Sequence, residues 1–258
     1  MLSVIVIAKN EELNIRRCLA SVSFADEIIV LDSGSTDETV AIAREFTPLV
    51  FSTDWQGYGV QKQRALDKAS SEWVLNLDAD ESVTPALKDD LLRVMRHDEY
   101  DAYRIPIRLC FYGRVLKYTS SPSRHARLFK REQAHFSTNI VHEKIILPLD
   151  SRIGRLKSPM IHHSLLDISH ALEKMNRYSS YSAKRKIQRH QSSNLGKACF
   201  GSLWMFFRCY VLQGGLWDGR AGFVLACLNA HGSFYRAIKQ IYPDGDLTRW
   251  PDDTGEYR

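Results

Sequence analysis

The stretch of sequence that decides the fold is Trp73-Val74-Leu75-Asn76-Leu77-Asp78-Ala79-Asp80-Glu81. A short apolar run bounded by polar residues is typical of a buried strand, and this one ends in three carboxylates. Asp78 and Asp80 lie two residues apart, so an extended backbone points both side chains to the same face. Such a pair suits a hard cation like Mg²⁺ or Mn²⁺, which binds carboxylates together with substrate phosphates. The alternative is a turn that caps the next helix, since Asp is common at both kinds of position.

Strands and helices are expected to alternate through the first hundred residues. Apolar runs predict strands at 3–8, 26–31, 49–52 and 73–77, and helical spacing predicts helices at 11–21, 37–46, 58–69 and 84–95. This alternation is typical of an α/β fold with a parallel central sheet flanked by helices. Ligands bind beyond the carboxyl ends of parallel strands. The polar residues that follow three of these strands are therefore expected at one edge of the sheet: Asn10, Glu11, Asp32, Asp78 and Asp80.

The pattern changes after residue 100. Strand-like alternation covers residues 102–108, 126–130, 136–144 and 159–163, and these strands are expected to extend the sheet. A long helix is expected from residue 169 to about residue 190. We therefore predict an α/β domain over residues 1–165 and a helical C-terminal extension over residues 166–258.

Charge is unevenly distributed along the 258 residues. The net charge is −8 over residues 1–100, +13 over residues 101–200 and zero over residues 201–258. The basic middle third favours an anionic partner such as a phosphorylated sugar, an anionic lipid surface or a nucleic acid, although a solvated basic surface is the alternative. Five scattered cysteines without a CxxC pair argue against a disulfide framework or a zinc site.

The C-terminal region is rich in aromatic residues between positions 199 and 242. Its longest unbroken apolar run covers only residues 223–228, and a spanning helix needs about 20 apolar residues, so we predict no transmembrane segment. Aromatic and basic residues together suit a helix on a membrane surface. The alternative is a helical pair that packs back on the sheet. The apolar start of the chain lacks a basic leader and is predicted to be the first strand.

Three segments of the first hundred residues resemble the family 2 inverting glycosyltransferases. Residues 4–11 resemble the opening strand with its trailing Asn10-Glu11, residues 29–39 resemble the D-x-G-S-x-D turn, and Asp78-Ala79-Asp80 resembles the D-x-D motif. Their order and spacing match as well. Residues 55–64, 140–143 and 215–222 resemble the subgroup that builds lipopolysaccharide core, most closely a β-1,4-glucosyltransferase that moves glucose from UDP-glucose to a heptose. The Q-x-x-R-W motif of processive synthases is missing, which implies a single addition.

The resemblance implies a GT-A-type, single Rossmann-like domain with a mostly parallel central sheet. Residues 1–100 would bind the nucleotide sugar, and residues 101–165 the acceptor. The implied nucleotide-sugar contacts are Ala8, Asn10, Glu11, Asp32, Lys62, Arg64, Asp78 and Ala79. The implied cofactor is a divalent metal, Mn²⁺ or Mg²⁺, held by Asp80 and by His162 or His163, and imidazole suits Mn²⁺ better. The alternative for Lys62 and Arg64 is that they lie on an exposed helix face. The alternative for His162 and His163 is an ordinary structural role.

Glu143 is the catalytic base that the resemblance implies, because it lies on a segment that the family places at the acceptor. One displacement on a UDP-α-sugar would then give a β-linkage. Acceptor contacts are expected from Arg104, Arg124, Arg127 and His142, since Arg forms bidentate contacts with phosphates and carboxylates. The implied partners are a UDP-sugar, a phosphorylated lipid-linked glycan and an anionic inner-leaflet surface. The implied location is cytoplasmic, peripheral on the cytoplasmic face of the inner membrane.

Three other functions fit parts of the sequence. A polyprenyl-phosphate or other glycan acceptor would keep the donor site and change the partner of residues 100–258. A nucleotidyltransferase would share the sheet, the metal and the nucleotide, but such enzymes carry a Gly-rich basic loop where this chain has Lys9-Asn10-Glu11-Glu12. A nucleic-acid binder is disfavoured by the acidic first third, so we expect no nucleic-acid partner.

Overall fold

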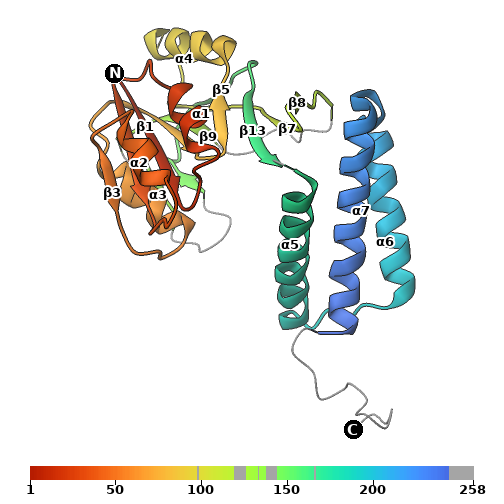
Figure 1. The fold of residues 1–258 in the computed structure, drawn as a ribbon. Helices are drawn as coiled ribbons and strands as arrows, with labels where there is room; N and C mark the ends of the chain where they lie inside the picture. The colour runs from red at the N-terminus through yellow and green to blue at the C-terminus, as the bar shows by residue number, and fades with distance from the viewer. Residues whose placement is uncertain (98, 119–125, 133, 138–143, 166, 244–258) are drawn as a thin grey trace. The chain divides into compact units, whose positions relative to one another are not determined.

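The computed structural model describes the chain except for residues 98, 119–125, 133, 138–143, 166 and 244–258 (Figure 1). The chain divides into two compact units, one of residues 1–110 and 120–164 and the other of residues 111–119 and 165–258. The sequence-based division after residue 165 differs from this at residues 111–119 and at Leu165, all of which belong to the second unit.

A seven-stranded sheet forms the centre of the first unit, in the order β12-β6-β9-β4-β1-β2-β3. Its strands are β1 (Leu2–Ala8), β2 (Glu27–Asp32), β3 (Val50–Ser52), β4 (Trp73–Asp78), β6 (Ala102–Arg104), β9 (Ala126–Lys130) and β12 (Ile153–Arg155). β1 pairs in parallel with β2 and β4, and the pairs β2–β3 and β6–β12 are also parallel. β9 runs antiparallel to both of its neighbours, β4 and β6. The predicted α/β fold with a mostly parallel sheet is confirmed.

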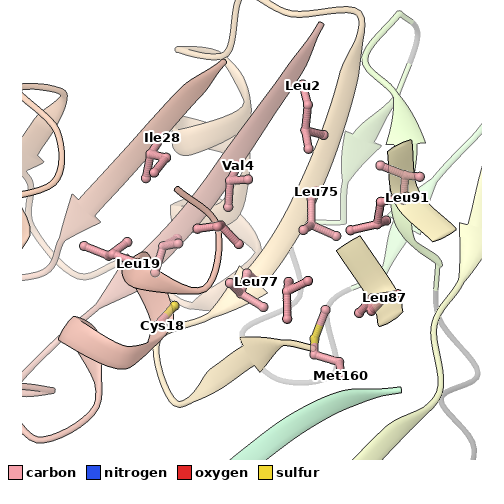
Figure 2. Close-up of a cluster of buried hydrophobic side chains, with 14 of the residues drawn as sticks. Leu2, Val4, Cys18, Leu19, Ile28, Leu75, Leu77, Leu87, Leu91 and Met160 are labelled. Atoms are coloured by element: carbon pink, nitrogen blue, oxygen red, sulfur yellow. The ribbon is translucent and has the colours of Figure 1, made fainter. Parts of the chain in front are cut away.

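Helices cover both faces of this sheet, and each face has its own apolar core. The helices are α1 (Ile15–Ala20), α2 (Thr39–Arg44), α3 (Tyr58–Leu66) and α4 (Pro85–His97). Val4 and Leu75 point to the face where they cluster with Leu19 of α1 and Leu91 of α4 (Figure 2). Val74, the neighbour of Leu75, points to the other face and clusters with residues of α3. This is the period-two alternation that a strand buried on both faces requires.

Two of the regions expected to extend the central sheet do not join it. β10 (His135–Phe136) pairs with β11 (Ile145–Ile146), and β13 (Met160–Leu165) lies between β5 (Glu81–Val83) and β7 (Ile107–Phe111) in a further sheet. The strand expected over residues 102–108 is divided into β6 and β7, with Pro106 between them. Proline cannot donate to a strand ladder, so it ends β6 there. The expectation for residues 159–163 and for Phe136 was wrong because alternation specifies a strand's faces but not its neighbours, and residues 138–143 lie outside the described part of the chain.

The second unit is helical, as predicted for the C-terminal region. It contains α5 (Ile168–Gln188), α6 (Leu195–Phe207), α7 (Gly219–Ile241), β8 (Arg114–Val115), a π-helical turn η1 (Arg208–Leu212) and a 3-10 turn η2 (Gly215–Asp218). α7 packs against both α5 and α6 (Figure 1). The side chains of Asp167 and Asn194 cap α5 and α6, accepting backbone N–H groups at 2.7 and 2.8 Å. In the described part of the chain, no helix is long and apolar enough to cross a membrane.

Candidate active site

The carboxyl ends of three adjacent strands meet at one edge of the central sheet. Ala8 at the end of β1 is paired with Asp32 at the end of β2, and Ile7 of β1 is paired with Asp78 at the end of β4. β9 runs in the opposite direction, so its start, with Arg127 at the second position, lies at the same edge. The structure therefore brings the predicted strand-end residues together and adds an arginine to them.

Asp78 lies between two cations from different parts of the chain. Its Oδ1 is 2.9 Å from Lys62 Nζ, and its Oδ2 accepts a hydrogen bond from Arg127 Nη2 at 3.0 Å. Lys62 comes from α3 and is only 4% exposed, so the alternative of an exposed helix face is wrong for this residue. Burial alone would raise the pKa of Asp78, but Arg127 and Lys62 outweigh it and hold that pKa well below its usual range.

Glu81 is a buried carboxylate of this cluster whose role the sequence did not reveal. Its Oε1 accepts a hydrogen bond from Arg127 Nη2 at 2.9 Å, and its Oε2 accepts the Asp78 backbone N–H at 2.9 Å. Burial, opposed by Arg127 and reinforced by the charge of Asp78, raises the pKa of Glu81 to about 7. Arg127 thus bridges two carboxylates at the end of β4, although we expected it to contact the acceptor.

Asp80 faces a histidine from a distant segment. The antiparallel pairing of β13 with β5 sets His162 opposite Glu81, and His162 Nε2 lies 2.9 Å from Asp80 Oδ2. The backbone N–H of His163 donates to the Asp80 carbonyl at 2.7 Å, while its ring contacts Ser82 Oγ at 2.9 Å. Burial, with Arg17 nearby, lowers the pKa of His163 to about 4. Of the two candidate histidines, His162 is the one whose ring faces Asp80.

The loops after β1 and β2 are tied to each other at the same edge. Asn10, with a φ of 56°, donates its backbone N–H to Ser35 Oγ at 2.9 Å and accepts the Thr36 N–H on Oδ1 at 2.9 Å. The carboxylate of Asp32 accepts the backbone N–H groups of Gly34 and Ser35, both at 3.0 Å. Asp32 therefore holds the turn that contacts Asn10, a structural role separate from the nucleotide-sugar contact predicted for it.

Helix α3 supports these loops through a buried glutamine that the sequence did not single out. Gln61 Nε2, which has two hydrogens to donate, lies 2.8 Å from Ser33 Oγ, 3.0 Å from Thr53 Oγ1 and 2.8 Å from the Asp54 carbonyl oxygen. Arg64 Nη1 pairs with Asp54 Oδ1 at 2.9 Å, so its guanidinium contacts the loop after β3. No pattern in the sequence distinguishes the buried Gln61 from the partly buried Gln63 or the exposed Gln56 near it.

The remaining predicted residues divide into two groups. The first group lies at the edge of the sheet or beside it: Ala79 is buried in the turn between β4 and β5, and Arg104 ends β6 at the same edge as Asp78. Glu11, in the loop after β1, accepts a hydrogen bond from Asn14 at 2.9 Å. The predicted base Glu143 and the predicted acceptor contacts Arg124 and His142 lie outside the described residues.

A divalent metal fits the Asp80–His162 pair. Within the described residues no group of three or more His, Cys, Asp or Glu side chains is arranged to hold a metal ion. Asp80 Oδ2 and His162 Nε2 nevertheless form a carboxylate–imidazole donor set suited to Mn²⁺. Catalytic ions of this kind take their other ligands from water and substrate phosphates, so two protein donors are sufficient.

Comparison with known proteins shows a match along most of the chain. The family described as Glycosyl transferase family 2 matches residues 3–146. The lipopolysaccharide core biosynthesis glycosyltransferase LpsC of Rhizobium meliloti is 31% identical over 97% of this chain and 95% of its own length. An uncharacterized glycosyltransferase of Rickettsia typhi, RT0209, is 30% identical over 92% of this chain and 86% of its own length.

Solved structures give a looser likeness. S. aureus TarS 1-349 in complex with UDP-GlcNAc aligns with 100% of this chain and 97% of that one at 15% identity, with a TM-score of 0.49. Glucosyl-3-phosphoglycerate synthase of Mycobacterium tuberculosis, in complex with Mn²⁺ and UDP-glucose, aligns over 52% of this chain and 57% of that one at 24% identity, with a TM-score of 0.37. At these TM-scores the assignment to a family rests on the sequence matches.

Proposed function

Because this chain belongs to glycosyltransferase family 2 and is a glycosyltransferase, we propose that it transfers glucose from UDP-glucose to a heptose of the lipopolysaccharide inner core. The transfer would invert the anomeric centre and form a β-linkage. Support for this acceptor comes from LpsC, a lipopolysaccharide core biosynthesis glycosyltransferase that matches nearly the whole chain. The proposed place of action is the cytoplasmic face of the inner membrane.

The observation that carries the proposal is the arrangement of charge after β4. Lys62 and Arg127 neutralise Asp78, while Asp80 next to it faces His162. A nucleotide diphosphate requires positive charge around its oxygens and a fixed orientation of the sugar. Asp80 and His162 would hold a divalent ion, which supplies Lewis-acid stabilisation of the departing diphosphate when it is bound. Asn10 and Asp32, at the ends of β1 and β2, would border the uracil and ribose.

Glu143 is the proposed general base, and it would take the proton from the acceptor hydroxyl as that oxygen attacks the anomeric carbon. We expect Glu143→Gln to leave UDP-glucose binding intact and to lower the transfer rate by about 10²–10⁴-fold, the usual contribution of a positioned base. Donor binding is measured by protection against heat, and transfer by release of UDP in the presence of acceptor. Near-normal turnover of this variant would assign the base elsewhere.

The decisive experiment pairs a donor panel with an acceptor panel. The purified protein is incubated with Mn²⁺, Mg²⁺ or EDTA and with UDP- and GDP-sugars, using lipopolysaccharide with a truncated core as acceptor. We expect transfer from UDP-glucose that EDTA abolishes. Transfer only to a polyprenyl phosphate would replace the acceptor, and pyrophosphate release from a nucleoside triphosphate and a sugar phosphate would indicate a nucleotidyltransferase.

Two histidine variants test the metal ligand with a matched control. His162→Gln removes the imidazole that faces Asp80, whereas His163→Gln changes a neighbouring ring that contacts Ser82. We expect His162→Gln to raise the Mn²⁺ concentration for half-maximal thermal protection at least about tenfold, and His163→Gln to leave it unchanged. Equal effects of the two variants would contradict the assignment of His162.

A further inference from the structure

The surface from α6 to η2 carries large apolar side chains that nothing covers in the described part of the chain. We call it the apolar face; it consists of Leu195, Phe200, Leu203, Trp204, Phe207, Val211, Leu212, Leu216 and Trp217. Phe200 is 73% exposed and Trp217 is 72% exposed. Large apolar side chains exposed together on neighbouring elements of a folded protein mark an interaction site.

The way α6 packs explains why these side chains remain outside. Phe200, Leu203, Trp204 and Phe207 recur at the spacing of one helical stripe. The side toward α7 combines small residues with one aromatic ring: Ser202 Oγ donates to the Ala230 carbonyl at 3.0 Å, Ala198 is buried, and the Phe206 ring packs against Phe223 at 5.7 Å between centroids. The contact of α6 with α7 thus uses Ala198, Ser202 and Phe206 and leaves the stripe of Phe200, Leu203, Trp204 and Phe207 exposed, whereas an ordinary surface helix exposes polar residues.

The stretch of chain that contains the apolar face carries charge of one sign. Residues 174–217 contain eight Lys and Arg residues and no Asp or Glu. The next acid, Asp218, is buried and accepts the backbone N–H groups of Lys117 and Tyr118 at 2.8 and 3.1 Å. This stretch of the chain therefore contributes cations and, up to Asp218, no carboxylates of its own, and such a surplus of positive charge attracts an anionic partner.

A basic cavity of about 400 Å³ lies beside the N-terminal part of α6. Lys186 of α5, Lys197 of α6 and Arg236 of α7 line it. Lys197 Nζ lies 3.5 Å from the Ser192 carbonyl and Arg236 Nη2 lies 3.1 Å from Ser233 Oγ, both neutral partners. None of the three cations forms an ion pair with a carboxylate among the residues that the structure describes. Three such cations around one cavity suit a phosphate group.

We propose that the apolar face and the basic cavity bind the surface of an anionic phospholipid bilayer. The aromatic and aliphatic side chains would enter the boundary between headgroups and acyl chains, and the cations of the cavity would contact lipid phosphates. A lipid surface fits better than a protein partner because an apolar patch on a stretch that carries cations and no acids, beside a cavity lined by three cations, matches a layer of apolar chains under anionic headgroups. All of these residues belong to the helical unit, so the proposal is independent of the chemistry at the sheet edge.

Vesicle sedimentation of the full-length protein tests the proposal. We expect binding to phosphatidylcholine vesicles that contain phosphatidylglycerol at low salt, and much weaker binding to pure phosphatidylcholine. Lys186→Ala with Lys197→Ala should lower the partition coefficient roughly 30-fold, since each basic residue at an anionic surface contributes about 1 kcal/mol. The charge-matched control is Arg96→Ala with Arg155→Ala, two exposed cations of the other unit, which should change it little.

The apolar arm of the test uses Trp204→Ser with Trp217→Ser, with Leu13→Ser and Leu149→Ser as exposed controls from the other unit. We expect the tryptophan variant alone to lose vesicle binding while keeping the wild-type thermal transition. Absence of wild-type binding to anionic vesicles would overturn the proposal. The proposal would also be overturned if light scattering showed that the wild-type protein is a dimer and the tryptophan variant a monomer. That result would assign the apolar face to contact with a second copy of the chain. Vesicle binding needs no sugar nucleotide, so its failure would leave the proposed transfer standing.

Discussion

Replacing Arg127 with methionine tests whether the carboxylates after β4 depend on a shared cation. Methionine keeps an unbranched side chain in β9 but removes both hydrogen bonds, the one to Asp78 Oδ2 at 3.0 Å and the one to Glu81 Oε1 at 2.9 Å. Asp78 would still have Lys62 at 2.9 Å. Glu81 would keep the Asp78 backbone N–H as a donor but would lose the guanidinium that lies against it.

The expected loss of stability follows from burial. Removing one partner of a buried ion pair costs about 3–5 kcal/mol because a charge is left uncompensated. Two features reduce this here: the Asp78 side chain is 34% exposed and retains Lys62, and Glu81 takes up a proton readily because its pKa is about 7. We therefore expect Arg127→Met to lower the free energy of unfolding by about 2–3 kcal/mol, a large share of the ~5–15 kcal/mol that stabilises a typical protein.

Urea unfolding followed by far-UV circular dichroism measures the effect as a lower midpoint with an unchanged m-value. Arg16→Met is the control, because Arg16 pairs with Glu45 at 2.6 Å on the exposed surface, where ion pairs contribute little. Adding Glu81→Gln to Arg127→Met should restore part of the loss, since the neutral amide needs no cation. If Arg127→Met were as mild as Arg16→Met, the bridging role of Arg127 would be refuted.

Three further outcomes are expected. Gly222→Ala should destabilise the helical unit by about 3 kcal/mol in thermal unfolding, because the added Cβ would lie 2.0 Å from a backbone carbonyl oxygen. Gly201→Ala is the control and should be neutral or mildly stabilising, because the nearest atom to its added Cβ is 3.6 Å away. The backbone N–H of Arg152 lowers the pKa of Asp101 in the folded protein, so Asp101→Asn should be less stable than wild type at pH 7. In urea unfolding, this difference in stability should shrink as the pH falls below about 4, the pKa of Asp in the unfolded chain, and then through the lower pKa of the folded protein. In the native protein a thiol reagent should label exposed Cys199 first and leave Cys18 unmodified until unfolding, because burial raises the pKa of the Cys18 thiol; peptide mass spectrometry distinguishes the two.

The sequence was sufficient to predict the elements that build the edge of the sheet. β1, β2 and β4 are apolar runs that end in polar residues, and parallel pairing alone requires such ends to meet. Register then adds what the sequence lacks: Ala8 stands beside Asp32, and Ile7 beside Asp78. The helices between the strands were also recognisable from their spacing, although α1 and α2 are shorter than predicted because polar loop residues begin both predicted segments.

The partners of Asp78 and Asp80 could not be predicted, because they come from strands whose neighbours are set by tertiary packing. Arg127 reaches Asp78 only because β9 inserts antiparallel between β4 and β6, and an antiparallel strand has the same two-residue period as a parallel one. His162 reaches Asp80 because β13 leaves the central sheet and pairs with β5. The burial of Glu81 is likewise invisible in a run of three acids, any of which an exposed turn would accommodate.

The two carboxylates of Asp78-Ala79-Asp80 end up in opposite electrostatic settings, and this difference limits what each can do. Both oxygens of Asp78 are engaged by cations of the protein, so a metal ion beside it would be repelled by Lys62 and Arg127. Asp80 instead faces an imidazole that can be neutral and can donate a lone pair. The pair that first suggested a cation between two carboxylates is therefore better understood as two sites: Asp78 fixes a lysine and an arginine at the sheet edge, and Asp80 is the carboxylate that would suit the proposed divalent ion.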